Sequence, residues 1–272
     1  MLNQHVIQDA REVAIKAARQ AGQAIKQLFD QVAHVEMKDE HGDVVTEADL
    51  LAEAIIVKEI QAAFPDHQIH SEEAGVIGVS SDWQWLVDPL DGTNNFAIGM
   101  PLFSCSITVM YQQEPVVGVV YEPMTDRLFH ATVGNGAYCN DQRMQVKSCP
   151  SLHKGNIGWI QGHKVQQDPT AVGLRHYIDT RCKRMMRLWA PTLQWSMLAK
   201  GDLDAIVLYK SEGDDLYSGI LMVKEAGGSV IHFHGKPFTG MHSEPYLIAC
   251  HPDHEQELMR MVRTGMSVPA RL

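Results

Sequence analysis

Cysteine is scarce in this chain and follows no recognisable pattern. Five cysteines occur among 272 residues, and no two of them form a C-x-x-C pair. An odd and scattered set argues against a disulfide framework and against a thiolate zinc site. Cys105 and Cys250 lie within apolar runs, where a free cysteine acts as a small hydrophobic residue.

Long apolar runs are also missing. No stretch approaches the roughly 18–20 apolar residues that are needed to span a bilayer. Residues 1–9 lack the basic start and apolar core of a secretory signal. With an ordinary globular composition of 45% hydrophobic and 21% charged residues, we expect a cytoplasmic protein that does not associate with a membrane.

Basic residues are outnumbered by acidic ones. The chain has 23 Lys and Arg against 33 Asp and Glu, and its formal net charge is −10. Binding to nucleic acid phosphates requires concentrated Lys and Arg, so nucleic acid is not the expected partner. The acidic excess has two open explanations. It reflects carboxylates that hold divalent cations, or it keeps the protein soluble.

The first half of the chain has the pattern of a mixed α+β unit. Apolar residues at steps of three and four predict a helix over residues 5–29 and a second helix from residue 43 to about residue 64, ended by Pro65. A short strand is expected at 34–38. Runs rich in Val, Ile and Thr then predict an antiparallel meander of three strands. These strands cover 104–111, 115–121 and 127–133.

The second half alternates short strands with helices, which favours an α/β unit. We place the boundary between two closely packed lobes near residue 148, so that the lobes cover 1–147 and 148–272. The strands expected in the second lobe are 156–160, 184–188, 204–208, 229–232 and 246–250. The helices expected there are 168–178, 191–200, 215–226 and 252–263.

One stretch combines two acids with a small, polar turn. The apolar run 85–87 predicts a buried strand that ends at Asp88, and Pro89 has no N–H with which to continue the sheet. Asp91 and the pair Gly92–Thr93 follow, and such a pair suits a turn whose backbone N–H groups face a ligand. Two acids beside such amides suit a hard cation with a phosphate. A simple turn capped by Asp91 is the equal alternative.

Further acids lie at the ends of other predicted elements. Thr46 and Asp49 form a capping box, and Asp215 suits the first position of a helix, so each has a sufficient structural explanation. Glu72 and Glu73 end a short segment, where neighbouring strand residues would point to opposite faces, although taken alone they suit a solvated pair at a turn. Several of these ends precede helices that can converge on one place. Together, the acids therefore favour a site for divalent cations.

The chain resembles the inositol monophosphatase-like family of magnesium-dependent, lithium-sensitive phosphatases. Residues 85–96 match the family signature W-h-h-D-P-h-D-G-T-x-N-F, in which h is hydrophobic, at every position. Weaker motifs extend the resemblance from residue 38 to residue 228. These are D-x-V-T-x-x-D at 43–49, F-P-D-H at 64–67, E-E at 72–73, D-x-x-x-G at 215–219 and E-A-G-G at 225–228.

The resemblance implies a metal site and a layered α/β/α/β/α sugar-phosphatase fold. About two or three Mg²⁺ ions per site would activate a water molecule for attack on phosphorus. The ligands implied by the family are Glu72, Asp88, the carbonyl of Leu90, Asp91 and Asp215. A homodimer is expected as well, because relatives often form one.

The resemblance also implies roles around the substrate. Glu72 and Thr93 would position the attacking water, and Asp49 would support Thr93, with Glu73 acting through water. Lys38 matches a lysine near the phosphate in relatives, with a plain surface lysine as the alternative. The substrate contacts implied by the family are Gly92, Thr93, Asp91 and Asp215.

Three departures from the family pattern concern the substrate. The segment 188–193 replaces the usual G-S-A-A-L, Leu208 stands where inositol phosphatases carry a glutamate, and Asp214 replaces a tryptophan-like residue. The metal ligands are unaffected, so we expect a phosphoric monoester hydrolase like the inositol-phosphate phosphatases. Its substrate would be a small polyol, sugar or inositol phosphate.

Other functions stay open. Fructose bisphosphate, histidinol phosphate and adenosine bisphosphate are alternative substrates, although Asn94–Asn95 replaces the Lys-Glu that adenosine bisphosphate phosphatases commonly carry. A regulatory or binding protein that keeps the phosphatase fold is an alternative of another class. An accessory factor of the RNA machinery would be one example.

Overall fold

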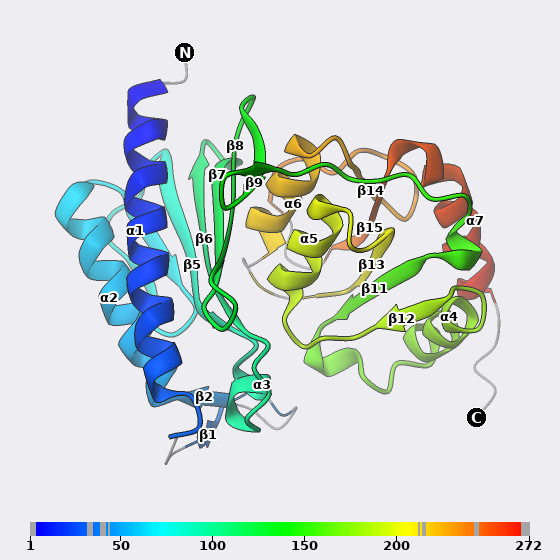
Figure 1. Ribbon diagram of the computed structural model, residues 1–272, viewed down its shortest axis with the longest axis horizontal. Coiled ribbons are helices and arrows are strands. Elements are labelled where there is room, and N and C mark those ends of the chain that lie inside the picture. The colour runs from blue at the N-terminus through cyan, green and yellow to red at the C-terminus, as the bar shows by residue number, and fades with distance from the viewer. Residues whose placement is uncertain are drawn as a thin grey trace.

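The protein is a stack of helices and sheets in five alternating layers (Figure 1). The computed structural model describes residues 4–31, 35–38, 42, 44–211, 213, 216–241 and 245–267. Helices α1 and α2 cover one face of an eight-stranded sheet, and α5 and α6 separate this sheet from a five-stranded one. Helices α4 and α7 cover the outer face of the second sheet. The expected α/β/α/β/α layering is confirmed.

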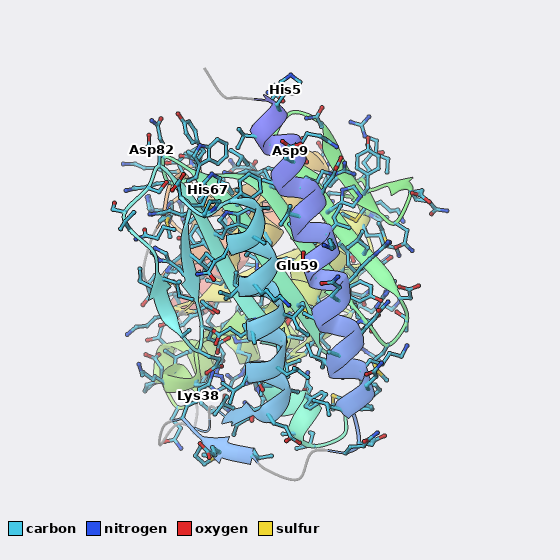
Figure 2. All side chains as sticks on the ribbon, turned by 90° about the vertical axis from the view of Figure 1, so that its left-hand side faces the viewer. His5, Asp9, Lys38, Glu59, His67 and Asp82 are labelled. Atoms are coloured by element: carbon cyan, nitrogen blue, oxygen red, sulfur yellow. The ribbon has the colours of Figure 1, made fainter. Side chains whose placement is uncertain are left out.

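Helices α1 (Gln4–Leu28) and α2 (Glu47–Ala63) lie side by side on the first sheet (Figures 1 and 2). The buried side of α1 is mainly alanine, and this small side chain lets α1 approach α2 and the sheet closely. An ion pair of 2.7 Å between Lys16 and Glu59 links the two helices on their outer side. The predicted helix over 5–29 is confirmed.

The start of α2 differs from the sequence prediction. Val44–Thr46 is strand β2, which pairs antiparallel with β1 (Val35–Met37), so the helix begins at Glu47 and not at residue 43. Thr46 has an extended backbone and completes the predicted capping box, because Asp49 accepts a hydrogen bond from the Thr46 N–H. The extended cap residue explains why the helix cannot start earlier. Asp43 itself lies outside the described residues.

The eight-stranded sheet contains the predicted meander. Its order is β10-β9-β8-β7-β6-β5-β3-β4, and every neighbouring pair is antiparallel except β3 and β5. The strands are β3 (Gln68–Ser71), β4 (Gly75–Ile77), β5 (Trp83–Asp91), β6 (Ser104–Tyr111), β7 (Glu114–Glu122), β8 (Arg127–Thr132), β9 (Gly136–Cys139) and β10 (Gln142–Arg143).

Strand β5 does not stop before Pro89, as the missing N–H of proline had suggested. It continues to Asp91, but its register against β6 shifts by one residue. Asp88 pairs with Ser106 and Asp91 pairs with Ser104, so three steps along β5 match two steps along β6. This bulge accommodates Pro89, because the extra residue is not needed for the ladder. The short helix α3 (Thr93–Ala97) follows.

The five-stranded sheet has the order β12-β11-β13-β15-β14. Its strands are β11 (Asn156–Gln161), β12 (Arg184–Met186), β13 (Ala205–Tyr209), β14 (Ser229–His232) and β15 (Tyr246–Cys250). Its helices are α4 (Pro169–Asp179), α5 (Pro191–Lys200), α6 (Leu216–Glu225) and α7 (Glu255–Met266), with 3₁₀ turns at Leu152–Lys154, His163–Val165 and Pro252–His254. The predicted α/β alternation is confirmed, and α5, β14 and β15 match to the residue.

The middle helix layer joins the two sheets through one continuous apolar cluster. Leu86 and Phe129 of the first sheet and Trp195 of α5 belong to this cluster. Helix α6 approaches α5 closely, since a side chain at Gly219 would collide with Trp195. The lobe boundary near residue 148 falls between the two sheets and stays a prediction. None of the helices within the described ranges combines the length and apolar character needed to cross a bilayer.

Candidate functional site

A cavity of about 650 Å³ lies where the end of β5 faces the second half of the chain. Most of the predicted site residues meet on one of its walls. The predicted residues that line it are Glu72, Asp88, Leu90, Asp91, Gly92 and Thr93. Asp49 lies behind this wall, in contact with Thr93. Asp215, the remaining predicted ligand, lies outside the described residues.

Asp91 is the most deeply buried acid that lines the cavity, with 3% of its surface exposed. Its Oδ2 accepts hydrogen bonds from the Thr192 N–H at 3.0 Å, from the Thr192 hydroxyl, and from the Ser104 hydroxyl at 3.3 Å. Burial nevertheless raises the pKa of Asp91 to about 7. These partners lie on β6 and α5, and α3 has no side-chain cap. The alternative interpretation, in which Asp91 only caps its own turn, is therefore wrong. Within the described part of the chain no donor contacts its Oδ1, which leaves that oxygen available to a cation.

Thr93 is held from behind by Asp49. The Thr93 hydroxyl lies 2.9 Å from Asp49 Oδ1 and 2.8 Å from the carbonyl oxygen of Leu90. Asp49 is 1% exposed, and its Oδ2 accepts from the Thr46 N–H at 2.8 Å and from the Thr46 hydroxyl at 2.6 Å. Burial raises the pKa of Asp49, while these donors oppose the shift. The capping box thus fixes the carboxylate that orients Thr93.

Asp88 folds over the bulge. Its Oδ1 accepts a hydrogen bond of 3.0 Å from the Leu90 N–H, which holds the carboxylate at the bulge. The bulge thus brings two oxygen donors of different types to the same end of β5. Carboxylate and carbonyl oxygens are the ligands that hard divalent cations prefer.

Glu72 and Glu73 both reach Lys38, contrary to the expectation that they face opposite ways. Lys38 Nζ lies 2.7 Å from Glu72 Oε1 and also pairs with Glu73. The strand rule fails because residues 72–74 form a turn between β3 and β4. Lys38, labelled in Figure 2, has a side chain only 20% exposed, so it is not a plain surface lysine.

The charges of this cluster depend on one another. Burial raises the pKa of Glu73 to about 6, although Lys38 opposes the shift. Burial alone would lower the pKa of Lys38, but its two carboxylate partners raise it well above the ordinary value. Lys38 therefore carries a positive charge at neutral pH and neutralises part of the acidic wall.

The opposite wall of the cavity contains residues that sequence reasoning missed. Gln161 ends β11, Gln166 follows a 3₁₀ turn, and Arg187 and Trp189 follow β12. Only Trp189 lies in the departure from the family pattern at 188–193, which also contains Thr192, and the sequence carried no signal for Gln161, Gln166 or Arg187. Leu208, the other departure, is fully buried and does not line the cavity.

Across the described ranges, no three His, Cys, Asp or Glu residues are grouped closely enough to hold a metal ion.

Comparison with known proteins agrees with the motifs in the sequence. The model of the inositol monophosphatase family matches residues 7–266. A fructose-1,6-bisphosphatase/inositol-1-monophosphatase of Aquifex aeolicus is 35% identical over 231 residues, which are 84% of this chain and 86% of the relative. The Nus factor SuhB of Pasteurella multocida is 33% identical over 260 residues, 94% of this chain and 96% of the relative.

Solved structures agree as well. The structure of an inositol monophosphatase (IMPase) from Thermotoga maritima superimposes with a TM-score of 0.85 at 30% identity. The match covers 94% of this chain and 98% of that structure. The layered arrangement of sheets and helices is therefore the arrangement found in that protein.

Proposed function

Because the chain belongs to the inositol monophosphatase family, we propose that it is a Mg²⁺-dependent phosphomonoesterase acting on a small polyol or sugar phosphate. Family membership and the Aquifex relative support a phosphatase. The observation that carries the proposal is the meeting of Glu72, Asp88 and Asp91 with Thr93 on one wall of a cavity of about 650 Å³. A cavity of this size suits a small metabolite.

Carboxylate and carbonyl oxygens are the ligands that magnesium prefers, but the described acids alone are not grouped closely enough to hold it, so the proposed site needs Asp215 as well. Asp91 lines the cavity, its Oδ1 has no donor among the described residues, and a nearby cation would offset the burial that raises the pKa of Asp91. We propose Glu72, Asp88, the Leu90 carbonyl and Asp91 as ligands, with Asp215 completing the set. Bound magnesium supplies positive charge and Lewis acidity to the phosphate group.

The protein's own groups would orient the water and the phosphate. The Thr93 hydroxyl has acceptors at both Asp49 and Leu90, so its proton is directed away from the cavity. Its oxygen can then accept a hydrogen bond from a water molecule and aim that water's lone pair at phosphorus. Glu72 lies on the same wall and can receive the proton that the water loses. The backbone N–H groups of Gly92 and Thr93 would bind phosphate oxygens.

The proposal is tested by phosphate release from a panel of polyol, sugar and inositol monophosphates. Purified protein should release phosphate with Mg²⁺ and lose this activity when the metal is chelated. Asp91→Asn should abolish release while its circular dichroism spectrum stays unchanged. A wild-type protein that is inert on the whole panel over a range of Mg²⁺ concentrations would contradict the proposal.

A second candidate function comes from the relatives named Nus factor SuhB. An accessory role in the RNA machinery would act through contacts between proteins, because the net charge of −10 opposes direct binding to RNA. Binding of the purified chain to RNA polymerase would support this role. Asp91→Asn separates the two functions, since it should remove phosphate release and leave such binding intact.

A further inference from the structure

The cavity wall opposite the acids is positively charged. Arg187 is exposed and lines the cavity directly after β12. Arg175 of α4 stands close enough that the charge of Arg187 helps to lower its pKa, after the larger effect of burial. Among the residues that the structure describes, no carboxylate pairs with either guanidinium. Two guanidinium groups that have no carboxylate partner among the described residues make a local field that attracts anions.

Two glutamines hold these arginines in place. Arg187 Nη2 donates to Gln166 Oε1 at 2.8 Å, and Gln161 Nε2 donates to the same oxygen at 2.9 Å. Gln161 Oε1 in turn accepts from Arg175 Nη1 at 2.8 Å. The amide oxygens orient the guanidinium groups without neutralising them. Among the described residues, Arg187 donates one hydrogen bond to the protein, which leaves most of its five donors for a ligand.

Trp189 stands beside Arg187 in an unusual conformation. Its side chain is 58% exposed and its φ is +51°, a left-handed value that is rare for a bulky residue. The preceding carbonyl, of Leu188, accepts a hydrogen bond of 2.6 Å from Asn95 Nδ2. Because Asn95 belongs to α3, this bond ties the segment to the wall that carries Thr93. An exposed ring that lines a cavity and stands on a strained backbone is a candidate for contact with a ligand.

We propose that Arg187 binds a second anionic group, a carboxylate or a second phosphate, on the leaving group of the substrate, while Trp189 packs against its carbon skeleton. This inference rests on the proposed phosphatase function and narrows its substrate class. The acidic wall takes the phosphate that is cleaved. The basic wall, at the carboxyl ends of the parallel strands β11 and β12, takes the anion that stays on the product.

Two matched pairs of substrates test the subsite. Glycerol 2-phosphate and 2-phosphoglycerate differ by a carboxylate, and fructose 1-phosphate and fructose 1,6-bisphosphate differ by a second phosphate. In at least one pair, we expect the wild-type kcat/KM to be higher for the substrate that carries the second anionic group. Arg187→Gln should lower kcat/KM for the substrate with the second anionic group about ten- to hundredfold. For the substrate without that group, kcat/KM should stay within about twofold of the wild-type value. The pair that responds identifies the anion.

Two further variants separate binding from structure. Arg184→Gln removes the same charge from an exposed position of β12 that does not line the cavity, so it should change neither pair. Arg187→Lys keeps the charge and should restore part of the loss. The preference for the anionic member should also weaken at high salt, because screening reduces the attraction.

The outcomes distinguish the subsite from the enzyme. A wild-type protein that hydrolyses these substrates without an Arg187-dependent preference would overturn the subsite and leave the phosphatase proposal standing. The same holds if Arg187→Gln lowers kcat/KM equally for the substrates with and without the second anionic group. A wild-type protein inert on all four substrates contradicts the phosphatase proposal, and the subsite fails with it.

Discussion

The Thr192 N–H donates to Asp91 Oδ2 across 3.0 Å, and this bond joins the start of α5 to the end of β5. The first N–H groups of a helix have no partner within the helix. Here one of them is satisfied by a buried carboxylate, which gains from the positive end of the helix dipole. The two halves of the chain are therefore connected at the centre of the proposed metal site.

Replacing Thr192 should weaken this connection. Thr192 is fully buried, and its hydroxyl donates to Asp91 as well. Thr192→Val keeps the shape but leaves Asp91 short of a donor, so the free energy of unfolding should fall by about 1–3 kcal/mol in urea denaturation. Thr192→Ser retains the hydroxyl and serves as the control. Equal stability of the Val and Ser variants would show that the hydroxyl contributes nothing.

Magnesium should stabilise the folded protein. A ligand that binds only the folded state at about 100 times its Kd adds about 2.7 kcal/mol. We therefore expect the Tm of the wild type to rise with Mg²⁺ and to fall again after chelation. Asp91→Asn should not respond, whereas Arg184→Gln should respond like the wild type. A rise of equal size in Asp91→Asn would place the bound metal elsewhere.

Gly219→Ala should destabilise the middle helix layer. An added Cβ would lie 2.2 Å from Trp195 Cβ, and Trp195 is fully buried, so neither helix can yield easily. Overpacking of this kind costs about 1–3 kcal/mol or more. Trp195→Gly removes the Cβ and Cγ atoms that the new methyl group would meet, so the loss in the double variant should be smaller than the sum of the two single losses. Thermal denaturation of the four proteins measures this coupling, and additive losses would contradict the contact.

His130 should make stability depend on pH. It is 7% exposed on β8 and stacks on Tyr138, and burial, aided by the charge of Arg11, lowers its pKa to about 4. As pH falls below about 6.5, His130 takes up a proton in the unfolded chain. In the folded protein it takes up this proton only at about pH 4. The free energy of unfolding should therefore fall with pH in this window, by at most about 1.4 kcal/mol per unit.

His130→Gln removes this contribution. The slope of unfolding free energy against pH should be shallower in the variant between about pH 6.5 and pH 4, whereas the two proteins should run parallel above about pH 7.5. Identical slopes throughout would mean that the pKa of His130 is the same in the folded and the unfolded protein.

Local sequence signals predicted the elements well. Helix α5 was found to the residue because Pro191 marks its first turn and Gly201, with φ +80°, ends it. The capping box at Thr46 and Asp49 was visible for the same reason. Such signals act over a few residues, so they need no knowledge of the fold.

Contacts between segments that are distant in the chain could not be predicted from the sequence. Nothing near Thr192 predicts that it meets Asp91, and nothing near Arg187 predicts that it faces a carboxylate-lined wall, because the fold alone brings these segments together. The sequence suggested that Glu72 and Glu73 form a solvated pair at a turn, and the turn is there, but nothing in the sequence predicted that Lys38 pairs with both acids. The family resemblance supplied the identity of the acidic wall, but it contained no pattern for the opposite one.

The bulge in β5 also decides which way its two acids point. Side chains alternate along a regular strand, so residues three apart would face opposite sides of the sheet. The extra residue at the bulge resets this alternation: Asp88 and Asp91 pair with Ser106 and Ser104, two residues that share a face. An odd spacing in the sequence thereby becomes an even one in the sheet. Deleting either residue between the acids would restore a regular strand, but it would remove the irregular backbone that brings the Leu90 carbonyl to the same place.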